Sequence, residues 1–405
     1  MTILIEVPFW ISLGIIVYTY LGYPALLVVL NAFRSLVDDS KDIGTVSHQV
    51  NDAMLPSITL IVAAYNEEDC IRAKVENSIG LDYPRDLVEM IVVTDGSTDG
   101  TVDIVRSFQH QNVCLLHQPQ RSGKTAAINR AVEVATGDVL VFSDANTMLN
   151  TQALRAITAD FRESSVGAVA GEKRVLTGTA DHAVAQENLY WKYESFLKNQ
   201  ESQFHTVIGA AGELFAVRRN LYVPVPPNVI LDDFYISLSV CRLGYTVKYA
   251  RDAYGEEFAS ANVAEEGKRK VRIAAGGFQS LQIFSDLKNP FGNWRLALQF
   301  VSHRFFRWSV CPFLLPVVVV LNGILAVSSP SGGPYWWLFI AQGLFYMLAL
   351  MGAVLSHRGI HWRLIRVPFY FAFMNWSVYL GFINFLSNKQ SAVWERSVRA
   401  RPGHH

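Results

Sequence analysis

Long uncharged apolar stretches lie near both ends of the chain and predict membrane-spanning helices. Residues 9–33 carry no charge over 25 positions, and at about 1.5 Å per residue they are long enough to cross a hydrocarbon core of about 30 Å. Three further uncharged stretches follow a long gap, at residues 309–327, 335–355 and 367–386. A signal peptide requires a basic segment before its apolar run, but no Lys or Arg precedes the first stretch. We therefore expect an N-terminal transmembrane helix within residues 1–33.

Basic residues beside these stretches predict how the chain crosses the membrane. Three arginines lie between the last two stretches, and because cytoplasmic loops are enriched in Lys and Arg, this loop is expected inside the cell. The middle of the chain, residues 34–308, is then expected on the cytoplasmic side of the plasma or inner membrane. Three crossings after it put the basic tail, residues 387–405, outside, against the same tendency. Either the tail is an exception or residues 367–386 do not cross, so we expect two to three transmembrane helices within 309–386.

In the middle of the chain, short β-branched apolar runs alternate with helical patterns. The strand patterns occur at residues 57–65, 88–95, 112–117 and 138–146. Strands that alternate with helices in this way predict a parallel α/β sheet.

These patterns divide the chain into consecutive segments. We assign residues 56–285 to a cytoplasmic domain and the polar residues 34–55 to a linker from the first helix. Residues 286–308 mix aromatic side chains with arginines, which favours an amphipathic helix on the membrane surface.

Composition narrows the class of protein further. The chain is 51% hydrophobic and 17% charged, with 35 basic residues, 35 acidic residues and four scattered cysteines. The high apolar content excludes intrinsic disorder, and four scattered cysteines exclude a disulfide scaffold. A net charge of zero gives no sign of a nucleic-acid partner.

Polar side chains follow the predicted strands at the edge of the sheet where ligands of such sheets bind. Asn66 and Glu67 follow the first strand, Asp95 ends the second, and Asp144 and Asn146 end the fourth. A carboxylate with a second oxygen two residues later suits Mg²⁺ or Mn²⁺, which take further ligands from phosphate and water. Asn146 is also a good N-cap for a following helix, so the metal site and the cap are alternatives.

Further charged residues suggest the chemistry of group transfer. Lys124 lies near a predicted helix N-terminus, where it could meet a diphosphate, although the P-loop pattern is absent. Asp232 and Asp233 are adjacent carboxylates, and one of them is a candidate general base for an acceptor hydroxyl, with helix capping as the alternative. Arg269 and Arg272 could hold a leaving diphosphate or face lipid head groups.

Seven segments in chain order resemble the membrane-bound family-2 glycosyltransferases, which include cellulose, chitin, hyaluronan and poly-N-acetylglucosamine synthases. They are VAAYNEE, DGSTDGT, SGKTAAIN, FSDAN, GAAGELFAVRR, LDD and RKVRI, and they cover nearly the whole chain between the apolar ends. The resemblance implies an α/β Rossmann-like domain of the glycosyltransferase A type with transmembrane helices at both ends. It also implies an enzyme that transfers a sugar from a UDP-sugar with inversion and depends on Mg²⁺ or Mn²⁺.

The resemblance implies a role for each matching position. Nucleotide-sugar binding is implied for Ala64, Tyr65, Asn66, Glu67, Asp95, Lys124, Asp144 and Arg269, metal binding for Asp144 and Asn146, and catalysis for Asp233 as the base with Asp232 and Arg272 beside it.

The sequence departs from the family pattern at three places. Asn146 replaces the second Asp of Asp-x-Asp, and Leu231 and Asp232 replace Thr-Glu before the base. Arg269 and Ile273 replace the Gln and Trp of Gln-x-x-Arg-Trp. The Trp caps the acceptor end in processive synthases, so its loss puts processive synthesis in doubt.

Two products are therefore expected as alternatives. The first is a growing polysaccharide or glycan, and the second is a membrane lipid that receives one sugar, as with ceramide glucosyltransferases. The expected partners are the UDP-sugar donor, a glycan or lipid acceptor and membrane lipids, with no nucleic acid. Because four spans are few for a secretion channel, export of the product would require a homo-oligomer or a secretion partner.

Overall fold

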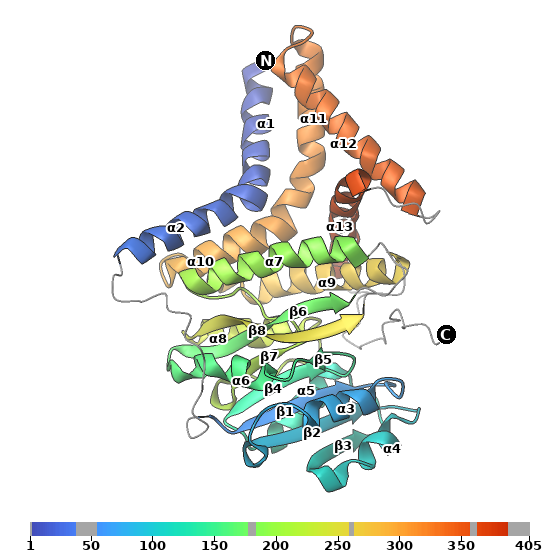
Figure 1. Cartoon of the computed structure of the whole chain (residues 1–405). Coiled ribbons are helices and arrows are strands. Elements are labelled where there is room, and N and C mark those ends of the chain that lie inside the picture. The colour runs from blue at the N-terminus through green and yellow to red at the C-terminus, as the bar shows by residue number, and fades with distance from the viewer. Residues whose placement is uncertain (1, 38–54, 177–183, 259–262, 357–362, 388–405) are drawn as a thin grey trace. The chain divides into compact units, whose positions relative to one another are not determined.

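The computed structural model describes residues 2–37, 55–176, 184–258, 263–356 and 363–387, which fall into two compact units (Figure 1). One unit, the helical unit, is built from helices at both ends of the chain. The other, the sheet unit, is built from the residues between them, 30–261.

The sheet unit contains an eight-stranded sheet in the order β3-β2-β1-β4-β7-β6-β8-β5. The strands are β1 (Ile58–Ala64), β2 (Val88–Asp95), β3 (Val113–Gln118), β4 (Val139–Asp144), β5 (Met148–Leu149), β6 (Val166–Leu176), β7 (Phe215–Arg218) and β8 (Thr246–Phe258). The helices of the unit are α3 (Ile71–Ile79), α4 (Thr101–Arg106), α5 (Lys124–Val134), α6 (Ala153–Thr158), α7 (Val184–Phe204) and α8 (Asp232–Arg242).

The first four strands confirm the predicted alternation and the predicted parallel sheet, but the sheet as a whole is mixed, because β6 and β8 pair parallel while β7 and β5 pair antiparallel to their neighbours. Strands β3, β2, β1 and β4 are parallel to one another, whereas β7 runs antiparallel to both β4 and β6. Strand β7 has four residues, and Phe215 at its start stacks on Phe142 of β4 with ring centroids 4.7 Å apart. Its direction depends on this partner distant in sequence, which a local pattern does not reveal.

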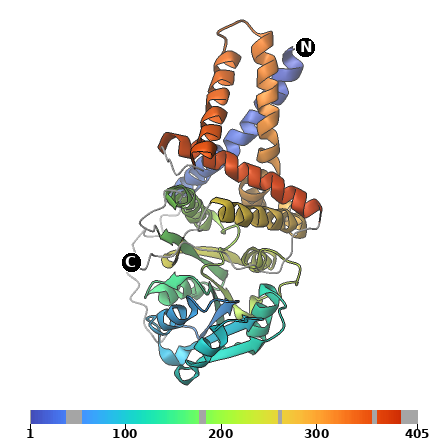
Figure 2. The same ribbon diagram turned by 90° about the vertical axis from the view of Figure 1, so that its right-hand side faces the viewer.

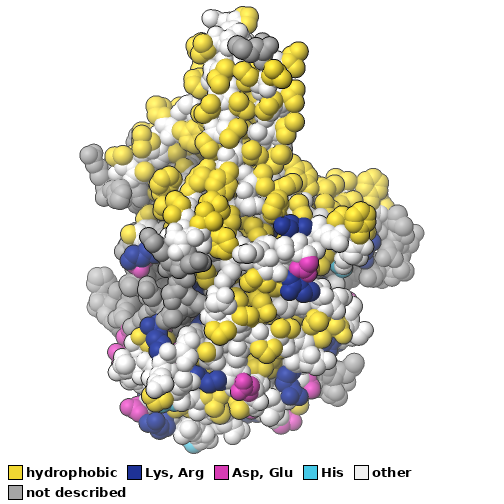
Figure 3. Space-filling model, turned by 180° about the vertical axis from the view of Figure 1, so that it is seen from behind, with side chains coloured by type: hydrophobic (Ala, Val, Ile, Leu, Met, Phe, Trp, Pro, Cys, Tyr) yellow, Lys and Arg dark blue, Asp and Glu magenta, His cyan; other side chains and the backbone are white. Residues whose placement is uncertain are grey.

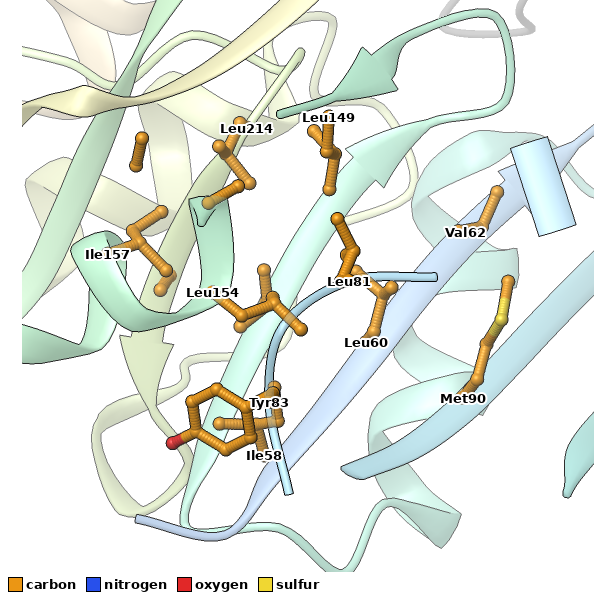
Figure 4. Close-up of a cluster of buried hydrophobic side chains, with 14 of the residues drawn as sticks. Ile58, Leu60, Val62, Leu81, Tyr83, Met90, Leu149, Leu154, Ile157 and Leu214 are labelled. Atoms are coloured by element: carbon orange, nitrogen blue, oxygen red, sulfur yellow. The ribbon is translucent and has the colours of Figure 1, made fainter. Parts of the chain in front are cut away.

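A buried apolar cluster holds the parallel strands against the flanking helices (Figure 4). Its labelled members are Ile58, Leu60, Val62, Leu81, Tyr83, Met90, Leu149, Leu154, Ile157 and Leu214. Burial of each large aliphatic side chain contributes about 1.5–3 kcal/mol. The cluster therefore fixes the ends of β1, β2 and β4, where the candidate site residues lie.

The predicted membrane stretches are all helical. Among the described residues, four helices have the length and composition to cross a membrane: Ile3–Leu36, Trp294–Ser328, Pro334–Leu355 and Ile365–Leu386. Hydrophobic side chains cover much of their surface (Figure 3). The bounds of the elements are α1 (Thr2–Val17), α2 (Tyr23–Val37), α9 (Val263–Ile283), α10 (Trp294–Gln299), α11 (Cys311–Ser328), α12 (Pro334–Ser356) and α13 (Arg363–Leu386).

Two π-helical segments make the longest helices continuous. One, Tyr18–Gly22, joins α1 to α2, and the other, Phe300–Val310, joins α10 to α11. Residues 286–308 are thus not the separate amphipathic helix that we predicted. A short 3-10 turn, Ser285–Lys288, is followed by α10, which runs directly into α11. The π-helical segment Phe300–Val310 joins α10 to α11 without an intervening turn, so one helix runs from Trp294 to Ser328.

The predicted segment boundaries also differ from the structure at other places. The predicted linker 34–55 begins as helix, because α2 continues to Val37. Most of the remaining linker, residues 38–54, and nearly all of the predicted basic tail lie outside the described residues.

Helix α9 packs within the helical unit, although we assigned its sequence to the cytoplasmic domain 56–285. It lies against α13 (Figure 2). A Cβ atom at Gly381 would lie 2.5 Å from Cβ of Ala274 and 2.9 Å from the carbonyl oxygen of Val271, so only glycine allows this approach. The close packing of α9 on α13 explains why α9 groups with the membrane helices.

Candidate functional site

The carboxylate of Asp95 at the end of β2 organises the loop before α5. Its Oδ2 accepts hydrogen bonds from the backbone N–H groups of Ser122 (2.9 Å) and Gly123 (2.6 Å). Its Oδ1 lies 3.4 Å from a guanidinium nitrogen of Arg130. Asp95 is buried, so these partners hold the loop that leads to Lys124 close to the end of β2.

The loop after β1 is fastened to the loop after β2. Asn66 adopts a left-handed backbone conformation with φ of 53°, and its Oδ1 accepts a hydrogen bond from the backbone N–H of Thr98 (2.8 Å). The backbone N–H of Asn66 donates to Ser97 Oγ (3.2 Å), and that of buried Glu67 donates to Thr101 Oγ1 (2.8 Å). Hydrogen bonds therefore join the two loops into one rim, and Asn66 makes two of these bonds.

An aromatic and cationic surface lies beside this rim. Ala64 ends β1 and is buried, while the next residue, Tyr65, is partly exposed. The guanidinium of Arg121 stands 3.8 Å from the centroid of the Tyr65 ring. Such a stacked pair offers a flat face to a planar group.

Three carboxylates and one lysine converge where β4, α5 and α8 meet. Lys124 is the first residue of α5, and its Nζ lies 2.9 Å from Asp144 Oδ1 and 3.3 Å from Asp232 Oδ2. Asp144 ends β4, and Asp232 and Asp233 form the first turn of α8. The Oδ1 of Asp233 accepts a hydrogen bond from the backbone N–H of Phe234 (2.8 Å). The structure thus brings together Lys124, Asp144 and the Asp232–Asp233 pair, which the sequence singled out separately.

Gly212 lines a small open space between these groups. A Cβ atom at Gly212 would lie 3.5 Å from Asp233 Oδ2, 3.7 Å from Asp144 Oδ2 and 3.7 Å from Lys124 Nζ. The free oxygens of two carboxylates from different elements therefore face the same point. This space is open only because residue 212 has no side chain.

Burial and mutual repulsion shift the pKa values in this cluster. Burial, followed by the charge of Asp232, raises the pKa of Asp233 to about 7. Burial also raises the pKa of Asp144, and Lys124 opposes that rise. Burial alone would lower the pKa of Lys124, but the three carboxylates raise it above its ordinary value. The cluster therefore carries more negative charge than one ammonium neutralises, which favours binding of a further cation.

The residues present fit a divalent metal that keeps some of its ligands from elsewhere. Within the described ranges, no three His, Cys, Asp or Glu side chains are placed to hold a metal ion by themselves. Asp144 nevertheless offers a free oxygen to the space beside Gly212. Asn146 lies in the turn after β4, and because Gln152 occupies the N-cap position of α6, Asn146 does not cap that helix. Few protein oxygens with room for phosphate and water are what Mg²⁺ and Mn²⁺ need.

The two predicted arginines, Arg269 and Arg272, belong to the helical unit. Arg269 is on α9, where its guanidinium lies 3.5 Å from Glu266 of the preceding turn. Arg272 is one turn further along the same helix. Their action on a diphosphate therefore stays a prediction from the sequence.

The sequence interpretation missed Lys74 of α3. Its side chain is buried, and burial lowers its pKa to about 7. Its Nζ donates hydrogen bonds to Ser143 Oγ and to the carbonyl oxygen of Thr147. A signal was present, because Lys74 falls on the same helical face as the apolar residues Ile71 and Val75.

A methyl group at position 212 should block the site without damaging the fold. We expect Gly212→Ala to lower the rate of transfer strongly, because its Cβ would fill the space between Asp144 and Asp233, while its contacts of 3.5–3.7 Å are ordinary van der Waals distances. The melting temperature should stay near that of the wild type. Gly292→Ala, at an exposed position with no atom within 4 Å of the added Cβ and without a positive φ, is the control for adding a methyl group. Full activity of Gly212→Ala would show that the reacting groups do not occupy this space.

Comparisons with known proteins agree with this arrangement. Residues 59–223 match the model of glycosyl transferase family 2. Among curated proteins, a poly-beta-1,6-N-acetyl-D-glucosamine synthase from Staphylococcus aureus is 26% identical over 246 residues, which are 59% of this chain and 59% of that protein. A probable glycosyltransferase from Bacillus subtilis, YdaM, is 25% identical over 251 residues, 60% of this chain and 59% of that protein. The chain thus matches about three-fifths of the length of these relatives.

A solved structure matches nearly the whole chain. The mannosyltransferase PcManGT from Pyrobaculum calidifontis, in complex with GDP-Man and Mn²⁺, superposes with a TM-score of 0.68 at 22% identity. The superposition covers 94% of this chain and 99% of that one. It shows that the two share a fold, and it confirms the glycosyltransferase A-type architecture expected from the resemblance.

Proposed function

We propose that this chain, a glycosyltransferase with a family 2 domain related to polysaccharide synthases, moves a sugar from a UDP-sugar to a growing polysaccharide or glycan acceptor. The observation that carries the proposal is the space beside Gly212, where the free oxygens of Asp144 and Asp233 and the ammonium of Lys124 meet. Inverting transfer in one displacement needs one base on the acceptor and charge stabilisation on the leaving diphosphate. The space borders groups suited to both tasks.

The residues of the sheet unit divide these tasks between them. Asp233 accepts the proton of the acceptor hydroxyl, and its pKa of about 7 suits a base that works near neutral pH. When the donor binds, the ammonium of Lys124 exchanges its carboxylate partners, Asp144 and Asp232, for the diphosphate of the donor. Asp144, with Asn146, holds a divalent ion, Mg²⁺ or Mn²⁺. When bound, that ion supplies positive charge to the diphosphate oxygens.

The remaining residues bind the other parts of the donor. The rim built from Asn66, Glu67 and Asp95 contacts the nucleoside, together with Ala64 and the face of Tyr65. Arg272 of α9 supports the leaving diphosphate, with Arg269 on the same helix.

A second candidate function is the transfer of one sugar to a membrane lipid. The observation that favours it is Ile273, which stands where processive synthases of the family carry the Trp of Gln-x-x-Arg-Trp. An aliphatic side chain does not provide the flat stacking surface of an indole. Both functions place the sheet unit at the cytoplasmic face of the plasma or inner membrane, supported by the four helices that can span it. Export of a polymer would involve a homo-oligomer or a secretion partner.

A panel of donors tests the proposal. Detergent-solubilised full-length protein is incubated with radiolabelled UDP- and GDP-sugars, with Mn²⁺ or Mg²⁺, and with glycan or lipid acceptors. We expect transfer from a UDP-sugar into products longer than a few units, and loss of transfer when EDTA removes the metal. Products with one sugar on a lipid would support the second function. Transfer from a GDP-sugar but from no UDP-sugar would overturn the assignment of the donor. Undiminished transfer in EDTA would overturn the proposed dependence on a divalent metal.

A further inference from the structure

A buried lysine lies beneath the donor site. The side chain of Lys74 on α3 is 0% exposed. Its Nζ donates hydrogen bonds to Ser143 Oγ (2.7 Å) and to the carbonyl oxygen of Thr147 (2.6 Å), both of them uncharged. No carboxylate of the described ranges forms an ion pair with it. Burial of this ammonium costs more than the nearby charge of Asp144 returns, since burial lowers its pKa in spite of that charge, so its presence at this position calls for a reason other than stability.

The partners of Lys74 enclose the candidate metal ligands. Ser143 immediately precedes Asp144, and Thr147 immediately follows Asn146. The ammonium of Lys74 is therefore hydrogen-bonded to both ends of the turn that carries the two predicted ligands. The turn has one further backbone bond of its own, from the N–H of Thr147 to the carbonyl oxygen of Asp144 (3.2 Å).

Ser143 links Lys74 to the segment on the other side of the site by a second hydrogen bond. Its Oγ accepts the hydrogen bond of Lys74 and donates one to the carbonyl oxygen of Glu213 (2.9 Å). Glu213 follows Gly212, the residue that lines the space between Asp144 and Asp233. The chain of bonds from Lys74 through Ser143 to Glu213 thus fixes the distance between the turn after β4 and the loop that contains Gly212 and Glu213, called the glycine loop below.

We propose that Lys74 is a positioning residue of the donor site, which holds Asp144 and Asn146 in the orientation that binds the metal–diphosphate group. The inference rests on the proposed function of Asp144. Lys74 acts through the turn and the glycine loop and touches no substrate atom.

The neighbouring strand does not depend on Lys74. Asn77, one helical turn further along α3, donates to the carbonyl oxygen of Leu149 (2.9 Å) and accepts from its backbone N–H (2.8 Å). Asn77 therefore attaches β5 to α3 on its own. Removal of the ammonium should loosen the turn at 144–147 while β5 and the fold stay in place.

The test replaces the ammonium by an apolar side chain of similar length. For Lys74→Met in the full-length solubilised protein, we expect binding of Mn²⁺ in the presence of UDP, measured by electron paramagnetic resonance, to weaken about 10- to 100-fold, as for other residues that orient metal ligands. We expect kcat to fall at saturating donor and metal. The melting temperature should be unchanged or higher, because the substitution removes a buried charge.

A matched control and a second variant sharpen the test. Arg72→Met removes an exposed cation from the same helix, whose guanidinium lies 5.5 Å from the centroid of the Phe108 ring, and should leave Mn²⁺ binding and kcat unchanged.

Ser143→Ala removes the hydrogen bond to the carbonyl oxygen of Glu213 and keeps the ammonium of Lys74. Its effect on Mn²⁺ binding should be in the same direction as that of Lys74→Met, and the double variant should be less impaired than two independent effects would predict.

The outcomes separate this inference from the proposed function. Mn²⁺ binding within twofold of the wild type for Lys74→Met overturns the inference, whatever its melting temperature. If that variant does not fold, wild-type Mn²⁺ binding by Ser143→Ala overturns it instead. A wild type that binds Mn²⁺ with UDP but transfers no sugar defeats the proposed function, while the weaker binding by Lys74→Met still supports the role of Lys74.

Discussion

Replacement of Asp233 by asparagine should reduce transfer about 10²- to 10⁴-fold, the range that general base catalysis contributes. The substitution keeps the volume of the side chain and an oxygen that can accept the hydrogen bond from the Phe234 N–H (2.8 Å). It removes only the ability to take a proton from the acceptor hydroxyl. Binding of the donor should therefore stay close to that of the wild type, and the loss should appear in kcat.

The pH dependence of the wild type provides an independent check on Asp233. Burial and the neighbouring Asp232 raise the pKa of the Asp233 carboxyl to about 7 without metal or donor. Below its pKa the carboxyl is protonated and cannot act as a base, so kcat/KM should fall about tenfold per pH unit on the acidic side. Because a bound divalent ion favours the ionised form, we expect this limb at or below pH 7. The limb should be absent from the residual activity of Asp233→Asn.

An exposed aspartate serves as the control for this substitution. The carboxylate of Asp103 on α4 is 82% exposed and pairs only with Arg106 of the next turn in the described part of the chain. Asp103→Asn should leave kcat and the pH profile unchanged. If Asp233→Asn kept a third or more of the wild-type kcat, Asp233 would not be the base, and Asp232 would be the next residue to replace.

Local patterns predicted those parts of the fold whose cause is local. The strands β1 to β4 are short, apolar and separated by helices, and their predicted bounds agree with the structure to within two residues. The placement of Asp95 and Asp144 at strand ends was predictable, because the last residue of a parallel strand faces the ligand edge of such a sheet. The placement of Asp232 and Asp233 at the start of α8 was predictable, because an apolar stretch leads into a helix at this point.

Features that depend on distant partners were not predictable in the same way. The direction of β7 follows from its pairing with β4, and the place of α9 follows from its close packing on α13. The partners of Lys124 were also unexpected, since the sequence suggested a diphosphate and the structure shows Asp144 and Asp232. Lys74 escaped notice because its partners, Ser143 and Thr147, lie about 70 residues away in sequence.

Asp144 and Asn146 allow the metal to be tested in both directions. We expect Asp144→Asn to lower kcat/KM about a thousandfold, because the charge that a metal places on the diphosphate is worth several kcal/mol and each 1.4 kcal/mol is about tenfold in rate. Asp138→Asn, at the opposite end of β4 and exposed, is the control and should be neutral. Part of the loss in Asp144→Asn should be recovered at high Mn²⁺ concentration.

The reverse substitution should strengthen the metal site. Asn146→Asp adds a second carboxylate two residues after Asp144, and since affinity for divalent ions rises with the charge of the ligands, Mn²⁺ binding should tighten about tenfold or more. The added charge also increases the repulsion among Asp144, Asp232 and Asp233, so the melting temperature without metal should fall and Mn²⁺ should restore it. This metal-dependent gain distinguishes a ligand from a residue that only shapes the turn. Equal Mn²⁺ affinity of Asn146→Asp and the wild type, measured with UDP bound, would place residue 146 outside the coordination of the metal and leave Asp144 as the protein ligand of this turn.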